Sequence, residues 1–323
     1  MISPANFAFF LTGLRVMFGE SYGTTPIWID KLVRTVPSST DTEGYGWTGM
    51  LDKPRLWDGP RVVHQPAPQT YFLQNQLWEL TESIDKLRLD DDKYGIYYRT
   101  IPDMGVSMKK NPDWQLRDLL ENAGKQTGAR QKGLDGLTHW NTAHPVDFYD
   151  ASKGTYCNDF LGGVSVGGIT VGGVLTPNAY ATLRQEFMNR KAENGEKLGL
   201  VPTLTWGPAQ LDVVAKYILQ AEILGLKSAY GATDNVGSAT NVLRASTDWW
   251  MNADLTSNTT WYMTDQSRGD KPFIRQQRQA VTLVQRTSPT DPVVFDTHTY
   301  LFGADERFTV GWGPAFLSAR SGS

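Results

Sequence analysis

Residues 45–70 most constrain how this chain can fold, because they contain large apolar side chains without a pattern that could bury them. The segment is rich in glycine, proline and tryptophan and has little apolar periodicity. It cannot build a core of its own, yet it carries four side chains that need burial: Trp47, Trp57, Val62 and Val63. A long extended loop that packs on another subunit would bury them, so we expect the chain to work within an assembly.

The composition indicates a globular chain and excludes several function classes. Of the 323 residues, 40% are hydrophobic and 20% are charged, and the formal net charge is −3. This balance lacks the basic excess that nucleic-acid or anionic-membrane binding would need. The single cysteine, Cys157, excludes an internal disulfide framework and a zinc site built on paired cysteines.

No targeting or membrane-spanning segment is expected. The sequence has no run of 18 apolar residues that could cross a bilayer. Its N-terminal apolar run is not preceded by a basic region, and we therefore expect a mature cytoplasmic start and no secretory signal.

The first half of the chain predicts a helix, a polar linker, a strand and a long broken helix. Apolar residues at helical spacing predict an amphipathic helix over 4–20, and 37–44 reads as an exposed linker. Residues 71–84 predict a strand. A helix over 93–123 should kink at Pro102 and restart at Pro112, and the acidic run 90–92 should lie at its N-terminus.

The second half opens on a three-fold glycine repeat. The pentads that begin at Gly162, Gly167 and Gly172 change the strand face at each unit, which predicts a glycine-articulated hairpin or arch. Further on, the patterns predict a helix over 177–193, a short strand over 201–206, a helix that starts at Pro208, and mostly β-structure over 249–310.

Two short motifs match signatures of catalysis or cofactor binding, but their contexts do not. Residues 44–49 fit the dinucleotide fingerprint without the preceding strand and following helix that it requires. Residues 163–167 fit the nucleophile elbow around Ser165, with His298 the only histidine downstream, but the glycine repeat continues where a helix should start. We interpret both matches as coincidences.

No metal or cofactor site is predicted. His139 and His144 lie five residues apart, which places them on different faces of a helix, and they have no partner in a recognised ligand pattern. The acidic run 90–92 could bind a hard cation, but a solvated helix cap is the better interpretation.

Ten segments, in the same order along most of the chain, resemble the Mu-type phage major head subunit (gpT) family. They are WIDK (28–31), VPSST (36–40), EGYGW (43–47), PRLWDGPRVV (54–63), DDKYG (91–95), TAHPV (142–146), WYM (261–263), KPF (271–273), YLFGADER (300–307) and VGWG (310–313). The glycine repeat and the segment around 225–240 match nothing in this family.

The resemblance implies an α+β fold of the Hong Kong 97 type, which has an N-terminal arm, an extended β-hairpin loop, a peripheral domain with a long spine helix, and an axial domain. The corresponding ranges are the arm 1–43, the loop 44–76, the peripheral domain 77–160 with the spine helix 93–123, the axial domain 161–245, and a β-rich return to the peripheral domain over 246–323.

The function implied is that of a major capsid protein, which is not an enzyme and needs no cofactor. Hexamers and pentamers of the chain would form an icosahedral shell around double-stranded DNA, bound weakly and without sequence preference. Portal, scaffold and decoration proteins would be partners, and the protein would reside in the virion after assembly in the host cytoplasm. The residues expected to contact neighbouring subunits are Phe7, Phe10, Leu14, Phe18, Trp47 and Trp57.

Two alternatives stay open from the sequence. The first is an encapsulin-like nanocompartment shell of the same fold, which would enclose an enzyme in place of DNA. The second, more remote, is a serine hydrolase built on Ser165.

Overall fold

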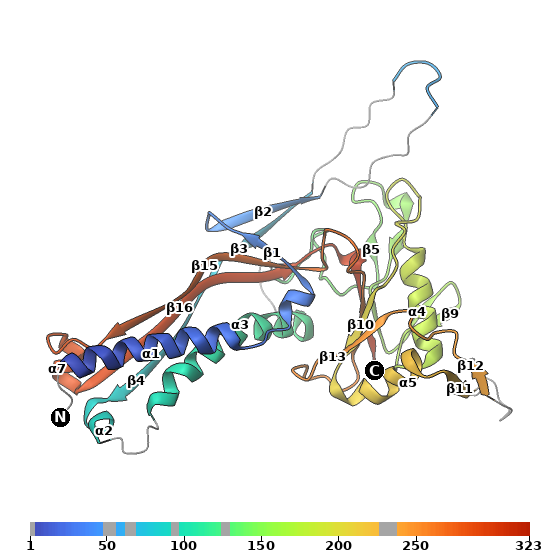
Figure 1. Cartoon of the computed structure of the whole chain (residues 1–323). Helices are drawn as coiled ribbons and strands as arrows, with labels where there is room; N and C mark the ends of the chain where they lie inside the picture. The colour runs from blue at the N-terminus through green and yellow to red at the C-terminus, as the bar shows by residue number, and fades with distance from the viewer. Residues whose placement is uncertain (1–3, 48–55, 62–68, 92–96, 124–129, 226–237) are drawn as a thin grey trace.

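The fold is an elongated α+β structure with a sheet at each end. The computed structural model describes residues 4–47, 56–61, 69–91, 97–123, 130–225 and 238–323. One end holds a long four-stranded sheet with two long helices, and the other holds a five-stranded sheet with two shorter helices (Figure 1). We call these the peripheral part and the axial part, after the domains that the sequence predicts.

The sheet of the peripheral part has the strand order β1-β15-β16-β4. Its central strands, β15 and β16, pair antiparallel over most of their length, and β1 adds in parallel to β15. Alternating burial along β16 shows that one face of the sheet is covered. The strands are β1 (Val33–Pro37), β4 (Gln76–Asp85), β15 (Phe273–Arg286) and β16 (Thr299–Trp312).

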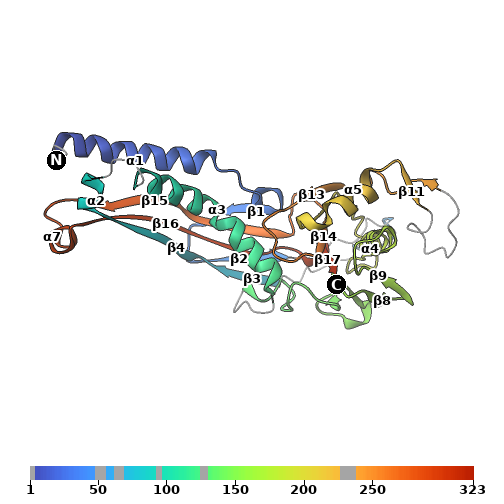
Figure 2. The ribbon, with the colours of Figure 1, turned by 90° about the horizontal axis from the view of Figure 1, so that it is seen from below.

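Two helices pack together on this sheet. Helix α3 (Thr100–Glu121) lies against β16, and α1 (Pro4–Thr24) runs along α3 (Figure 2). The helices approach closely at Gly105, where a Cβ atom would come within 2.8 Å of the Phe18 carbonyl oxygen. The predicted helix over 4–20 is therefore confirmed, and it extends to Thr24.

Helix α3 differs from the predicted broken helix. Pro102 lies in its first turn, where a missing N–H leaves no helical hydrogen bond unmade, and so it causes no interruption. Pro112 lies inside a helix that continues to Glu121, so the predicted restart at this residue is wrong. Burial of Met108, Pro112 and Leu116 along one side of the helix stabilises it across the proline.

The sheet of the axial part has the strand order β13-β10-β14-β17-β7. The C-terminal segment 246–323 supplies strands to this sheet as well as to the peripheral one. Its strands are β7 (Asp159–Leu161), β10 (Leu204–Gly207), β13 (Asp248–Met251), β14 (Trp261–Thr264) and β17 (Ser318–Gly322). The limits of the predicted domains stay predictions.

Helices α4 (Pro177–Asn189) and α5 (Asp212–Gln220) share an apolar core with this sheet. The Arg190 guanidinium, buried at the end of α4, donates to three carbonyl oxygens: Phe316 at 2.6 Å, Ser318 at 3.0 Å and Cys157 at 2.9 Å. Burial lowers the pKa of Arg190 to about 10. These bonds tie α4 to the C-terminal strand.

The glycine repeat forms the predicted hairpin. Strands β8 (Val164–Val166) and β9 (Ile169–Val171) pair antiparallel, with Gly167 and Gly168 in the turn. Both turn glycines have positive φ, 57° and 85°, as a two-residue hairpin turn requires. The other glycine pairs of the repeat lie at the two ends of the hairpin and also have positive φ.

The remaining elements are short. The predicted strand over 71–84 is two strands, β3 (Gln69–Gln74) and β4, and β3 pairs with β2 (Thr42–Trp47). Of the acidic run 90–92, Asp90 is the last residue of α2 and Asp91 is its C-cap, so these two acids lie at a helix C-terminus. Asp92 lies outside the described residues. The others are α2 (Lys86–Asp90), α7 (Pro292–Thr297), β5 (His144–Pro145), β6 (Thr155–Tyr156), β11 (Ile223–Gly225) and β12 (Ser238–Thr240).

Candidate functional site: surfaces available for assembly

The β2–β3 hairpin is fixed to the peripheral sheet at its base. The Tyr45 hydroxyl donates to Gln276 Oε1 at 2.9 Å, and Arg307 forms an ion pair with Asp41. Leu73 is fully buried against the sheet, where it touches the position of Gly311. The extended loop therefore starts from a base that is fixed to the sheet.

A carboxylate holds the turn that precedes the hairpin. Glu43 accepts hydrogen bonds from the Ser39 N–H at 2.8 Å, the Thr40 N–H at 3.1 Å and the Ser38 hydroxyl at 2.9 Å. These bonds, led by the one from Ser39, lower the pKa of Glu43 to about 2. These hydrogen bonds therefore stabilise the turn at every pH at which Glu43 is ionised.

The described tip of the loop, 56–61, lies away from both sheets (Figure 1). Within it, Trp57 is 71% exposed, donates its indole N–H to the Gly59 carbonyl at 2.9 Å and is stacked by the Arg61 guanidinium at 4.7 Å. The side chains of Trp47, Val62 and Val63 lie outside the described residues. An exposed indole that is already oriented by its own loop is suited to a contact with another chain.

The apolar stripe of α1 is used inside the chain. Leu14 and Phe18 are 1% and 5% exposed and belong to a core between α1, α3 and the sheet, and Phe10 packs partly on that core, with its ring 5.0 Å from that of Tyr98. The expectation that the stripe contacts neighbouring subunits is therefore wrong for Leu14 and Phe18, which are buried inside the chain, while Phe10 stays partly exposed. Among the side chains of α1 from Phe9 onward, the large apolar ones that are exposed are Phe9, Val16 and Met17. The side chain of Phe7 lies outside the described residues.

A buried carboxylate of α3 holds the segment that joins α1 to β1. Asp113 Oδ1 accepts from the Ile29 N–H at 2.8 Å and from the Trp28 N–H at 3.1 Å. Burial raises the pKa of Asp113 to about 6, although these hydrogen bonds oppose the rise. These hydrogen bonds fix the segment after α1 to the spine helix. Sequence reasoning missed this contact, because burial of Asp113 depends on a segment 84 residues away in the sequence.

A second buried carboxylate lies between α3 and the sheet. Glu306 on β16 is fully buried, and its Oε1 accepts from the Asn111 amide at 3.1 Å. Among the described residues, its Oε2 has no hydrogen-bond partner. Burial raises the pKa of Glu306 to about 7, while Asn111 and the charges of Arg275 and Lys109 lower it in part.

This carboxyl predicts a pH dependence of stability. The folded state holds the Glu306 proton more tightly than the unfolded chain, so its stabilisation is complete below the unfolded pKa near 4.5 and is lost as pH rises to about 7. Glu306→Gln should remove this loss, on the order of 3 kcal/mol at most, and raise the melting temperature above pH 7. Thermal unfolding between pH 4 and 8 measures it.

The exposed Glu79 on β4 provides the control, because Glu79→Gln removes a carboxylate without changing a buried site. Asp113 acts in the same direction as Glu306, so the Glu306→Gln variant should retain part of the pH dependence. A melting profile identical to that of the parent in this variant would contradict the prediction.

The two histidines of the sequence analysis lie in a buried hydrogen-bond network. His144 Nδ1 pairs with Asp135, and its Nε2 lies 2.9 Å from the His139 carbonyl. His139 Nε2 lies 2.9 Å from the Ser318 hydroxyl and its ring stacks on Trp312 at 4.1 Å. Burial lowers the pKa of His139. In the described part of the chain, no group of three potential ligands is placed to hold a metal ion.

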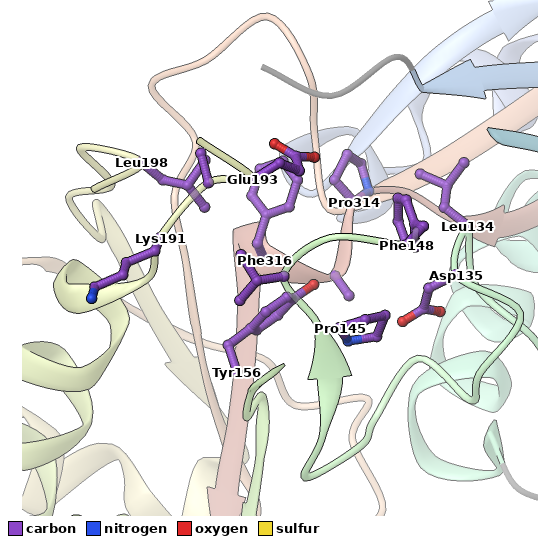
Figure 3. A pocket seen from close by; sticks show the side chains of 13 residues that line it. Leu134, Asp135, Pro145, Phe148, Tyr156, Lys191, Glu193, Leu198, Pro314 and Phe316 are labelled. Carbon is purple, nitrogen blue, oxygen red and sulfur yellow. The ribbon is translucent and has the colours of Figure 1, made fainter. Parts of the chain in front are cut away.

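A pocket opens beside this network, between the 134–156 segment and the end of α4 (Figure 3). It is partly open to solvent, and aliphatic and aromatic side chains such as Phe148, Tyr156 and Phe316 form most of its wall. Of its two acids, Asp135 and Glu193, the first pairs with His144.

Neither short motif has the backbone that its chemistry requires. Ser165 is exposed in the middle of β8, opposite Thr170 of β9, so the chain turns into a second strand where the nucleophile elbow needs a helix. Residues 44–47 of the dinucleotide-like motif lie in β2, and 48–49 lie outside the described residues. In the part of the chain with assigned structure, no helix is both long and apolar enough to cross a membrane.

Comparison of the sequence with known protein families shows which family the chain belongs to. The family described as "Mu-like prophage major head subunit gpT" matches residues 8–166 and 244–321, which is more than half of the chain. The chain belongs to this family. It is therefore a major head subunit, the major capsid protein of a tailed phage or prophage, and a component of the virion.

Two relatives of the head subunit align over nearly the whole chain. The major capsid protein of Escherichia phage Mu is 24% identical over 97% of this chain and 72% of its own length. The Mu-like prophage FluMu major head subunit of Haemophilus influenzae is 21% identical over 97% of this chain and 71% of its own length.

Solved capsids have the same fold. The procapsid of bacteriophage JBD30 superposes with a TM-score of 0.55 at 23% identity, covering 100% of this chain and 76% of that one. The cyanophage Pam1 capsid superposes with a TM-score of 0.54 at 10% identity, covering 90% and 88%. The head subunit thus has the predicted Hong Kong 97-type fold.

The family match leaves out residues 167–243. This segment contains strands β9 and β10 and the described helices of the axial part, α4 and α5.

Proposed function

We propose that hexamers and pentamers of this chain close into an icosahedral shell that encloses packaged double-stranded DNA. Membership of the head subunit family carries the proposal. The rigid base of the extended loop and the exposed Trp57 beyond it support the proposal, because a subunit that needs neighbours must present apolar anchors outside its own core.

The proposal includes the partners and places that the family implies. Portal, scaffold and decoration proteins would bind the shell, which would assemble in the cytoplasm of the bacterial host. Contacts through Phe10, Trp47, Trp57 and the N-terminal Phe7 belong to the same proposal. For Leu14 and Phe18, the intrachain core takes the place of that role.

One negative-stain micrograph of the purified protein tests the assembly. We expect closed shells of uniform diameter. A population of monomers or dimers at every concentration and salt tried would overturn the proposal, and shells that enclose a protein cargo would instead favour a nanocompartment.

We expect the isolated subunit to bind DNA weakly and without sequence preference. The net charge of −3 offers no electrostatic footprint, and scattered lysines such as Lys109 and Lys110 supply at most a few phosphate contacts. Filter binding with two unrelated duplexes at physiological salt measures this. Tight binding that distinguishes the two duplexes would contradict it.

The role proposed is structural, without catalysis at Ser165. A fluorophosphonate probe should leave the protein unlabelled, because the hairpin offers Ser165 no elbow and pairs it with Thr170. Ser165→Ala should assemble as the parent does. Stoichiometric labelling that disappears in this variant would restore the hydrolase alternative.

A further inference from the structure

The β8–β9 hairpin is an exposed element without charge. Residues 160–183 contain no charged side chain, although charged residues make up 20% of the whole chain. Strands β8 and β9 form a sheet of two strands, with no third strand among the described residues. Exposed edge strands normally carry charges that prevent pairing with other chains. A hairpin without them indicates that another surface covers it in the working state.

The apolar face of the hairpin extends past its own core. Side chains alternate between faces, so Val164, Val166, Ile169 and Val171 share one face and Ser165 lies on the other. Val171 is buried, and Val164 and Val166 pack partly on the axial core. Ile169, next to the turn, is 57% exposed. The face thus continues from the core of its own subunit into open space.

Hydrogen bonds at the base of the β8–β9 hairpin fix the position of its exposed end. The Gly173 N–H donates to the Ser321 hydroxyl at 2.7 Å, and the Gly162 N–H donates to the Gly322 carbonyl at 2.8 Å. At Gly172 a Cβ atom would come within 2.6 Å of both Phe160 and Ser321, so only glycine fits. A hairpin anchored to β7 and β17 in this way loses little freedom when it docks.

A second exposed apolar surface lies on α5. Val213 is 78% exposed and Val214 is 40% exposed, and Tyr217, one turn after Val213, is 42% exposed. The opposite side of the helix, with Ala215, Ile218 and Leu219, is buried in the axial core. Helix α5 therefore has apolar side chains on both its inner and its outer side.

The two surfaces flank α4 on opposite sides. In Figure 2, which looks along α4, helix α5 lies on one side of it and the β8–β9 hairpin lies on the other. One copy cannot join its own two surfaces across α4, but successive copies can. A head-to-tail contact of this kind generates closed rings, whereas a surface that pairs with itself gives only dimers.

We propose that the β8–β9 hairpin of one copy packs, with Ile169 foremost, on the Val213 face of α5 in the next copy around a ring. The inference rests on the proposed function, in which the chain forms rings of five and six. It also gives a role to the glycine repeat, which lies mostly outside the segment matched by the family. The partner is a second copy of this chain. The hairpin is uncharged, and on α5 the exposed Lys216, beside Val213, is already paired with Asp212 at 2.7 Å.

A cysteine pair tests the contact directly. In the double variant Ile169→Cys with Val213→Cys, oxidation should link successive copies into a ladder that ends at closed pentamers and hexamers on a denaturing gel without reductant. Each single variant should stay monomeric, and the native Cys157 is buried and should not react. Because a disulfide needs Cα atoms within about 7 Å, absence of the ladder overturns the proposal. Dimers from Val213→Cys alone would also overturn it, in favour of a two-fold contact.

Two aspartate substitutions, one on each face of the hairpin, provide a second measurement. Ile169→Asp should lower the yield of shells at least tenfold, and Ser165→Asp, on the other face of the same hairpin, should leave it near that of the parent. Equal yields from the two variants would overturn the proposal. Electron microscopy of the parent scores shell formation separately, so an absence of shells counts against the proposed function, while the cysteine ladder still decides whether hairpin and α5 meet.

Discussion

Replacing Trp57 by alanine is expected to give a subunit that folds but does not close into shells. The indole is 71% exposed in the subunit, so its removal costs the folded chain little. In the assembly, a buried tryptophan anchor contributes about 2–4 kcal/mol per contact, and the loss recurs at every subunit. Denaturant unfolding should match that of the parent, while light scattering and electron microscopy should find no closed shells.

A graded variant keeps this prediction sharp. Trp57→Phe retains an aromatic ring without the indole N–H that donates to Gly59, so it should form shells at an intermediate yield. Both the yield and the thermal stability of the particles should fall from the parent to Trp57→Phe and again to Trp57→Ala. Shells of normal yield and stability from Trp57→Ala would show that the loop is not the anchor.

Replacing Phe18 by alanine, by contrast, is expected to destabilise the folded subunit itself. Phe18 is 5% exposed between α1, α3 and the sheet, and its backbone carbonyl lies against Gly105. Removing a buried phenylalanine from such a core costs about 3–5 kcal/mol. The midpoint of denaturant unfolding should fall accordingly, and α1 should become sensitive to proteolysis before the rest of the chain.

Phe9 on the same helix is the matched control, because it is 83% exposed. Phe9→Ala should change the free energy of unfolding by less than about 0.5 kcal/mol. If both variants unfold at the same denaturant concentration, α1 does not pack on α3 in solution and the arm is free, as the sequence alone suggests.

Local sequence patterns correctly predicted the helices and hairpins that depend on residues close together in the chain. The helical spacing from Phe7 to Phe18 was sufficient for α1, and the paired glycines of the repeat were sufficient for the β8–β9 hairpin. Both depend on backbone preferences and on periodicity, which a sequence displays directly. The Gly/Pro/Trp-rich composition likewise predicted an extended loop, and the structure places its described tip away from both sheets.

Predictions that depended on what covers a residue were less successful. The proline at 112 was expected to break the spine helix, but packing of Met108 and Leu116 stabilises the helix on either side of it. The acids Asp113 and Glu306 gave no signal in the sequence, because their raised pKa values arise from burial, of Asp113 against residues 28–29 and of Glu306 between α3 and the sheet. The Val213 face of α5 was read simply as part of a helix, since exposure is a property of the packed molecule.

The order of residues was enough to establish that this chain is a head subunit, since ordered motifs along most of its length identify the family and a family implies a fold. It also established which segments are extended, helical or turned. Folding in three dimensions was needed to show which apolar side chains are buried inside the subunit, such as Leu14 and Phe18, and which remain for neighbours, such as Trp57, Ile169 and Val213. Hydrophobicity is a local property of a residue, whereas burial depends on segments far apart in the chain that meet only on folding.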